Sequence, residues 1–191
     1  MSEVKVRYFD EPGSANTDET ITLGIKRALE LELRYVVVAT TTGDTALLVK
    51  NKADKNGFSG NLVAVTYHVG FSKPNEDRMG SEMRKKLEES GFRLVTGCHA
   101  LSGPERSFRY QFKGIYPLEM IASTLRLFSQ GVKTCVEIAV MAADAGAVLS
   151  GEDALFIAGT GKGADTACVI SPAHQNNFLD LSIREILAMP R

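Results

Sequence analysis

The chain has 191 residues, 44% of them hydrophobic, and its 22 basic and 23 acidic side chains leave a formal net charge of −1. This length and composition suit one hydrophobic core, so we expect residues 1–191 to form a single domain. The charge balance argues against a nucleic-acid partner, and no apolar run reaches the roughly 18 residues of a membrane span, which argues against a membrane partner.

Strand and helix patterns alternate through the first part of the chain. Residues 4–9 (VKVRYF) predict a strand, and residues 16–29 predict a helix whose apolar side chains recur at helical spacing. Two nearly continuous apolar runs, 35–40 (YVVVAT) and 61–68 (NLVAVTYH), predict the next strands, since such runs are typical of strands covered on both faces. Residues 45–52 between them predict a helix.

The middle of the chain has two helical patterns in a row. A charged helix at 81–90 and a strand at 92–98 (FRLVTGC) come first. Residues 99–116 show no clear periodicity and are expected to form a long loop. Helices are then expected at 118–130 and 132–148, and the second of these is the more apolar.

The end of the chain predicts a hairpin. Residues 154–159 (ALFIAG) and 166–170 (TACVI) read as strands joined by a glycine-rich turn, and residues 181–189 read as a short terminal helix. Right-handed helical crossovers between parallel strands fit the order of elements. We therefore expect an α/β fold, a three-layer α/β/α arrangement with a mainly parallel sheet of about five strands, whose last strand is antiparallel at an edge.

A cluster of threonines follows the second predicted strand. Its members are Thr40, Thr41, Thr42, Gly43, Asp44 and Thr45. Ligands of open parallel sheets bind beyond the carboxyl ends of strands, and a turn into a helix presents free backbone N–H groups to an anion. The cluster therefore predicts a phosphate site. The competing interpretation is a helix cap, a role in which Thr and Asp are both common.

Two further segments are candidates for ligand contact. Thr66, Tyr67 and His68 end the third strand, where they suit stacking and proton transfer or simply a roof over the core. The glycine-rich turn combines a flexible backbone with one ammonium group and hydroxyls, a set that suits an anion or a plain hairpin. Its candidate residues are Gly159, Thr160, Gly161, Lys162, Gly163 and Thr166.

Several other polar residues are open to two interpretations. Arg106 in the 99–116 loop offers a planar fork for carboxylate or phosphate, or is simply solvated. Glu137 and Asp144 share one helix face and suit a site, a subunit contact or the wet edge of a buried helix. After the last predicted strand, a pocket lining or a solvated loop accounts for His174, Asn176 and Asn177.

The cysteines and histidines show no metal-ligand spacing. Cys98, Cys135 and Cys168 lie in apolar neighbourhoods and are expected in the core. Cysteine catalysis by the adjacent Cys98 and His99 is not favoured, because neighbouring side chains on a strand point to opposite faces.

Two resemblances bear on the threonine cluster. The pattern T-x-T-G-x-T, at Thr40, Thr42, Gly43 and Thr45, is similar to the phosphate loop of flavodoxins, which implies FMN as cofactor. YVVVATTTGDTA, NLVAVTYH and ALFIAGTGKGADTACVI resemble the C-terminal α/β domain of pyruvate kinase and free-standing proteins like it. That resemblance implies a phosphate of a sugar bisphosphate at the threonine loop, with the glycine loop beside it. The barrel of pyruvate kinase is absent, so its phosphotransfer chemistry is not implied.

Three functions follow as hypotheses. The first is binding of a small phosphorylated ligand, with FMN the leading candidate. The second is a phosphosugar- or nucleotide-dependent enzyme with His68 or His174 as acid or base, and the third is a regulatory or assembly protein derived from an effector-binding domain. A homo-oligomer fits all three, with residues 132–148 as a possible contact. The start of the chain lacks a signal-peptide pattern, and a cytoplasmic location is expected.

Overall fold

The apolar runs form a seven-stranded sheet in the computed structural model, which describes residues 3–191. The strand order is β1-β7-β6-β5-β2-β3-β4. The strands are β1 (Arg7–Phe9), β2 (Tyr35–Ala39), β3 (Asn61–Tyr67), β4 (Phe92–Gly97), β5 (Ala154–Ala158), β6 (Thr166–Ser171) and β7 (Ser182–Pro190). The α-helices are α1 (Thr17–Glu30), α2 (Asp44–Lys55), α3 (Ser81–Glu89), α4 (Glu105–Phe112), α5 (Pro117–Leu125) and α6 (Gln130–Asp144). Two short 3-10 helices, η1 (Ser14–Asn16) and η2 (Gln175–Asp180), complete the set.

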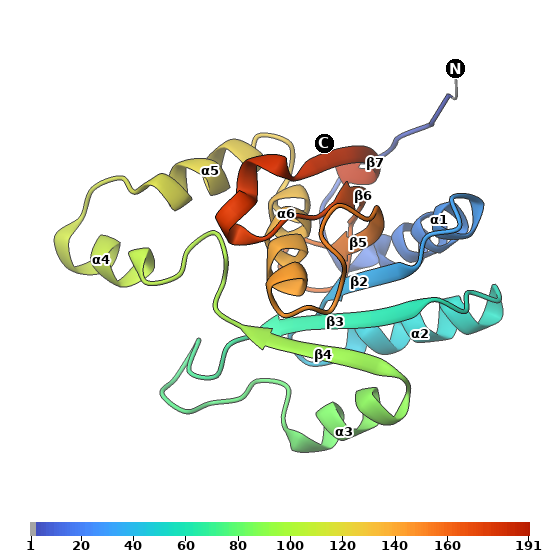
Figure 1. Ribbon diagram of the computed structural model, residues 1–191, viewed down its shortest axis with the longest axis horizontal. Helices are drawn as coiled ribbons and strands as arrows, with labels where there is room; N and C mark the ends of the chain where they lie inside the picture. Colours follow the sequence, from blue (N-terminus) through green and yellow to red (C-terminus); the bar gives the residue numbers. More distant parts are fainter. Residues whose placement is uncertain (1–2) are drawn as a thin grey trace.

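Strand directions confirm the predicted mainly parallel sheet with antiparallel strands towards one edge. Strands β5, β2, β3 and β4 are mutually parallel. Strand β6 returns antiparallel to β5, as the predicted hairpin requires, and β7 is antiparallel to β6. The three-layer α/β/α prediction is therefore correct, but β6 is not the edge, because β7 and β1 extend the sheet beyond it (Figure 1).

The predicted terminal helix at 181–189 is wrong. This segment is β7, which pairs with β6 on one side and with β1 on the other. Its Leu187 and Ala188 are buried against the core. Pairing and burial on the sheet outweigh the helix preference of its sequence, a preference that tertiary contacts commonly override.

Two apolar cores cover the two faces of the sheet. One is built around α6, with Val37, Val63 and Phe156 from the strands. The other is built around α1 and α2, with Val36 and Val38. Alternating residues of one strand thus serve opposite cores, which explains the unbroken apolar runs in the sequence.

Helix α6 is buried within its own chain. It begins at Gln130 because Ser129 caps it, the Ser129 hydroxyl accepting from the backbone N–H of Val132 at 3.0 Å, and it ends at Asp144. The fold covers 12 of its 15 residues. The predicted helix at 132–148 is confirmed with shifted ends, and its apolar residues pack within the chain.

The segment between β4 and α6 contains a helix that the sequence did not reveal. Residues 99–116 include α4, and the next helix, α5, ends at Leu125 instead of residue 130. Both helices lie beyond the ends of β3 and β4, at the left of the molecule in Figure 1. Phe108, Tyr110 and Phe112 of α4 remain exposed, so the helix lacks the buried stripe by which a sequence pattern is recognised.

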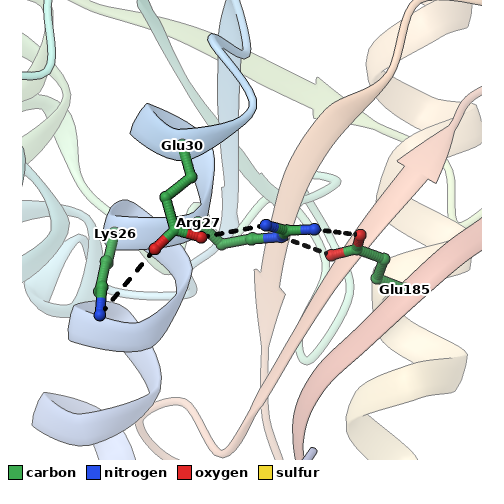
Figure 2. A network of polar contacts seen from close by, with 4 residues as sticks. All are labelled: Lys26, Arg27, Glu30 and Glu185. Carbon is green, nitrogen blue, oxygen red and sulfur yellow. Dashed lines mark hydrogen bonds and ion pairs between the residues drawn. The ribbon is translucent and has the colours of Figure 1, made fainter. Parts of the chain in front are cut away.

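An ion-pair network ties α1 to β7 (Figure 2). Arg27 donates to both carboxylate oxygens of Glu185, at 2.8 and 2.6 Å, and to Glu30 at 3.0 Å. Lys26 adds a longer contact to Glu30, at 3.9 Å. A bidentate arginine of this kind fixes orientation as well as distance, so it helps to hold the last strand against the first helix.

Two of the three cysteines are core residues as predicted. Cys135 and Cys168 are buried, whereas Cys98, which follows β4, is exposed, contrary to expectation. None of the helices in residues 3–191 has the length and apolar character to cross a membrane.

Candidate functional site

The parallel strands β2, β3 and β5 have their carboxyl ends side by side, at the same end of the sheet. Ala39 pairs with Val65 of β3, and Val38 pairs with Ile157 of β5. Continuing these registers sets Thr40 level with Thr66 and with Gly159, each about 4.8 Å away across one strand spacing. The threonine loop and the start of the glycine loop are therefore neighbours at this edge.

The threonine loop is a tight turn into α2. Gly43 adopts a left-handed φ of 96° and donates its N–H to the Thr40 hydroxyl at 3.0 Å. Thr40 and Thr45 are buried, and Thr41 is half-buried. Thr40 thus closes the turn through its hydroxyl, as it would without any ligand.

The mouth of the loop is formed by Thr42 and Asp44. Both are exposed, and the Thr42 hydroxyl donates to the Asp44 carboxylate at 2.8 Å. The N-cap residue of α2 is Gly43, which has no side chain to cap the first helical turn. The first turn of a helix leaves backbone N–H groups without intrahelical acceptors, at the positive end of the helix dipole. The loop thus presents donors to an anion, with Asp44 as a competing carboxylate.

The glycine loop is anchored by one buried carboxylate. Asp165 is fully buried and accepts from the N–H of Gly13 at 2.9 Å, from the N–H of Thr160 at 3.1 Å and from the Thr166 hydroxyl at 2.9 Å. A second tie joins the N–H of Ala164 to the Thr17 hydroxyl at 3.0 Å. The loop between β5 and β6 is therefore fixed to the amino-terminal segment.

The tip of this loop is open, but its end is not. Gly161 and Lys162 are exposed, Gly159, Thr160 and Gly163 are half-buried, and Thr166 is fully buried. The Thr166 hydroxyl donates to Asp165 inside the fold, away from the exposed tip of the loop. Lys162 forms no ion pair with any of the residues that the structure describes.

Tyr67 and His68 belong to a cluster of rings with Phe71 and His99. The ring centroids of Tyr67 lie 4.3 Å from Phe71 and 5.0 Å from His99, and that of His68 lies 5.7 Å from His99. Arg106 stacks on Phe71, with its guanidinium carbon 4.6 Å from the ring centroid. These mutual contacts take up much of the predicted stacking surface. Thr66 is only 3% exposed.

His99 was not predicted as a functional residue. Its Nδ1 is buried and has no hydrogen-bond partner within residues 3–191. Burial lowers the pKa of His99 to about 4, with smaller contributions from Glu137, which raises it, and Lys133, which lowers it. The imidazole is therefore neutral at neutral pH.

A buried ion pair lies behind His99. Lys133 and Glu137, at 6% and 3% exposure, are joined at 2.5 Å, and the other Glu137 oxygen accepts from the N–H of Leu101 at 3.1 Å. The expectation of a wet helix edge is thus wrong for Glu137. It is correct for Asp144, which is exposed and accepts from the N–H of Gln175 at 3.1 Å.

His174 lies at the opposite end of the strands from the threonine loop. Because β6 runs antiparallel to β5, its last residue is next to the start of β5, and His174 follows it. There His174 lies 3.3 Å from Asp144, and the adjacent Asn176 and Asn177 are exposed. A role for these residues beside Thr40–Thr45 is excluded by this reversal of direction.

Comparison with known protein families shows which family the chain belongs to. Residues 18–170 match the model of the pyruvate kinase alpha/beta domain. The chain belongs to this family. The match includes both the threonine loop and the glycine loop, as the sequence resemblance predicted.

Solved pyruvate kinases of Cryptosporidium parvum are among the structural relatives of this pyruvate kinase alpha/beta domain protein. One, named CGD1_2040, is 14% identical, with 74% of this chain and 20% of that chain covered and a TM-score of 0.38. Another has 16% identity, 78% and 22% coverage and a TM-score of 0.37. A third, in complex with ADP, has 17% identity, 92% and 24% coverage and a TM-score of 0.38. The chain spans about a quarter or less of their length.

A cavity lies between α4, α5 and the turn after β4. Its volume is about 230 Å³, and it is lined by Leu101, Ser102, Glu105, Arg106, Arg109, Tyr116, Glu119, Ala122 and Arg126. Of these, only Arg106 was considered from the sequence. No group of three or more His, Cys, Asp or Glu side chains in the described part of the chain is arranged to hold a metal ion.

Proposed function

We propose that this protein binds a phosphate-bearing small molecule at the carboxyl edge of β2 and β5, with the phosphate at Thr40–Thr45. FMN is the ligand to test first, because T-x-T-G-x-T is similar to the flavodoxin phosphate loop. The observation that carries the proposal is the start of α2 at Gly43. Its backbone is in a left-handed conformation, its own N–H is bonded to the Thr40 hydroxyl, and as a glycine it has no side chain to occupy the N–H groups of the first helical turn.

The charges around the threonine loop favour binding of an anion, except for the carboxylate of Asp44. The N–H groups of the first turn of α2 point towards the loop, and Lys162 adds an exposed ammonium group from the neighbouring strand connection. Asp44 opposes a phosphate unless its carboxylate turns away. Its hydrogen bond with Thr42 at 2.8 Å is between two exposed side chains, so exchange of the Thr42 hydroxyl to a phosphate oxygen requires only local rotation.

If FMN is the ligand, electron transfer belongs to the flavin, and the protein supplies binding, orientation and donors around it. His68 is half-buried and follows β3, the strand that pairs with β2 and so ends next to the threonine loop. The enzyme hypothesis with His174 has no support, because His174 is at the other edge.

The proposal is tested by purifying the protein and recording its visible spectrum, followed by melting curves with FMN, a sugar bisphosphate, ADP and inorganic phosphate. Thr42→Ala and Lys162→Ala are suitable variants because both side chains are exposed, and Lys55→Ala at the far end of α2 is the matched control. A flavin band, or a rise in Tm with one phosphate compound that Lys162→Ala reduces and Lys55→Ala preserves, supports the site. If none of the compounds raises Tm, Thr40–Thr45 is a helix cap only.

A further inference from the structure

The cavity between α4 and α5 is rich in arginine. Among its lining residues are Arg106, Arg109 and Arg126, against two glutamates, Glu105 and Glu119, so the lining has an excess of one positive charge. All of these side chains come from the segment between residues 101 and 126, which lies outside the sheet and beyond the ends of β3 and β4 in Figure 1. The cavity is therefore a feature of this segment and not of the threonine loop.

Two of the three arginines are free to meet a ligand. Arg109 is paired with Glu119, and Glu105 accepts from the N–H of Leu118 at 3.1 Å. Neither Arg106 nor Arg126 has a carboxylate partner within residues 3–191. Arg126 donates its Nε to Gln130 at 2.7 Å, which orients the guanidinium.

Arg106 is also held in place. Its guanidinium carbon lies 4.6 Å from the centroid of the Phe71 ring, a stacked position that leaves the edge of the guanidinium free to donate hydrogen bonds. The turn that leads into α4 is fixed from below, because Glu137 accepts from the N–H of Leu101 while it is paired with Lys133. A buried ion pair thus supports one wall of the cavity.

Positive charge accumulates around this wall. Burial lowers the pKa of Lys133, and Arg126 and Arg106 lower it further, in opposition to Glu137, which raises it. Arg106 also contributes to the lowered pKa of His99. Both arginines therefore act on the buried Lys133, and an anion between them relieves this repulsion.

We infer that this cavity is a second anion site, which binds a small doubly charged oxyanion, either a phosphate monoester or a dicarboxylate, between Arg106 and Arg126. Paired guanidinium forks match the oxygens of both groups. A volume of about 230 Å³ suits a small metabolite, since pockets for drug-sized ligands begin at about 300 Å³. The inference does not depend on the function proposed for Thr40–Thr45.

The test is isothermal titration of the full chain with inorganic phosphate and, separately, with succinate. Titration is done in a Thr42→Ala/Lys162→Ala background, so that the proposed phosphate loop does not contribute. The compared changes are Arg106→Ala/Arg126→Ala and the control Arg78→Ala. Arg78 lies over Tyr67 of the same ring cluster, at 5.9 Å, but does not line the cavity.

We expect binding that is retained with Arg78→Ala and weakened at least tenfold with Arg106→Ala/Arg126→Ala. Because the double change can affect folding, Arg126→Glu is the second variant; its side chain is exposed, and it should abolish binding without unfolding. Binding of phosphate alone identifies a phosphate monoester, and binding of succinate alone identifies a dicarboxylate. Equal affinity in the arginine variants, or absence of binding of both anions, overturns the inference, and neither result bears on FMN at Thr40–Thr45.

Discussion

Lys133 and Glu137 lie one turn apart on α6 and form an ion pair of 2.5 Å inside the core. Glu137 also accepts the N–H of Leu101, from a segment 36 residues away in sequence. Removal of one member of a buried pair leaves an uncompensated charge, which is more costly than removal of both.

Lys133→Met is accordingly expected to lower the free energy of unfolding by about 3–5 kcal/mol. Lys133→Met/Glu137→Gln should recover most of this loss, because the glutamine oxygen still accepts from Leu101 and no charge remains. Urea unfolding of Lys133→Met, Glu137→Gln and the double variant measures the coupling energy between the two residues. A double variant as unstable as Lys133→Met contradicts this interpretation.

His99 makes stability depend on pH. Its pKa in the folded protein is about 4, mainly because of burial, whereas an unfolded histidine titrates near 6.5. The unfolded chain therefore binds the extra proton first, so the contribution of His99 to stability is complete above pH 6.5 and is lost as the pH falls towards 4. We expect a loss of roughly 2 kcal/mol after allowance for partial exposure. Melting curves between pH 7.5 and about 4 should show a smaller decline for His99→Phe; an equal decline excludes His99 as the cause.

Asp165 is expected to be the most sensitive residue of the glycine loop. Asp165→Ala removes the acceptor for the N–H groups of Gly13 and Thr160 and for the Thr166 hydroxyl. Each unsatisfied buried donor costs about 1–3 kcal/mol, so we expect a loss of several kcal/mol. The control Asp153→Ala breaks a longer, exposed contact with Arg184, at 3.3 Å, and should cost less than about 1 kcal/mol. Similar Tm values for the two variants argue against the anchoring role.

Gly43 and Gly161 provide a matched pair for the two loops. Both have a positive φ, of 96° and 75°, but a Cβ at Gly43 meets the Cγ of Met83 at 2.3 Å, while a Cβ at Gly161 meets nothing within 4 Å. Gly161→Ala should cost about 1 kcal/mol from backbone strain alone, and Gly43→Ala clearly more. Gly43→Ala/Met83→Ala then separates the steric part of the cost. Chemical unfolding measures the stability of each variant. Equal losses of stability for Gly43→Ala and Gly161→Ala contradict the close contact between residue 43 and Met83.

The central sheet was predictable because its strands are buried on both faces. Val36 and Val37 serve opposite cores, so the apolar run in the sequence is unbroken and marks the strand directly. In β7, by contrast, the neighbours on both sides determine the strand, and those neighbours are far away in sequence.

The candidate site was predictable only in part, for the same reason. The position of Thr42 at a strand end follows from local pattern, whereas the buried contacts of His99 and Lys133 depend on partners that no local pattern reveals. The position of His174 could not be predicted either, because the antiparallel direction of β6 places it beside the start of β5, and this pairing is not visible in the local sequence. The hydrogen bond from the Thr166 hydroxyl to the buried Asp165 was likewise not predicted from the sequence.

The most direct measurement is the dissociation constant for FMN, obtained from quenching of flavin fluorescence, for wild type, Lys162→Ala and Lys55→Ala. We expect wild type and Lys55→Ala to bind equally, and Lys162→Ala to bind several-fold more weakly, with a smaller dependence on salt, because one positive charge is removed from the loop next to the proposed phosphate site. Riboflavin, which lacks the phosphate, should bind much more weakly than FMN to wild type. Equal affinity for FMN and riboflavin, or no effect of Lys162→Ala, contradicts a phosphate site at Thr40–Thr45.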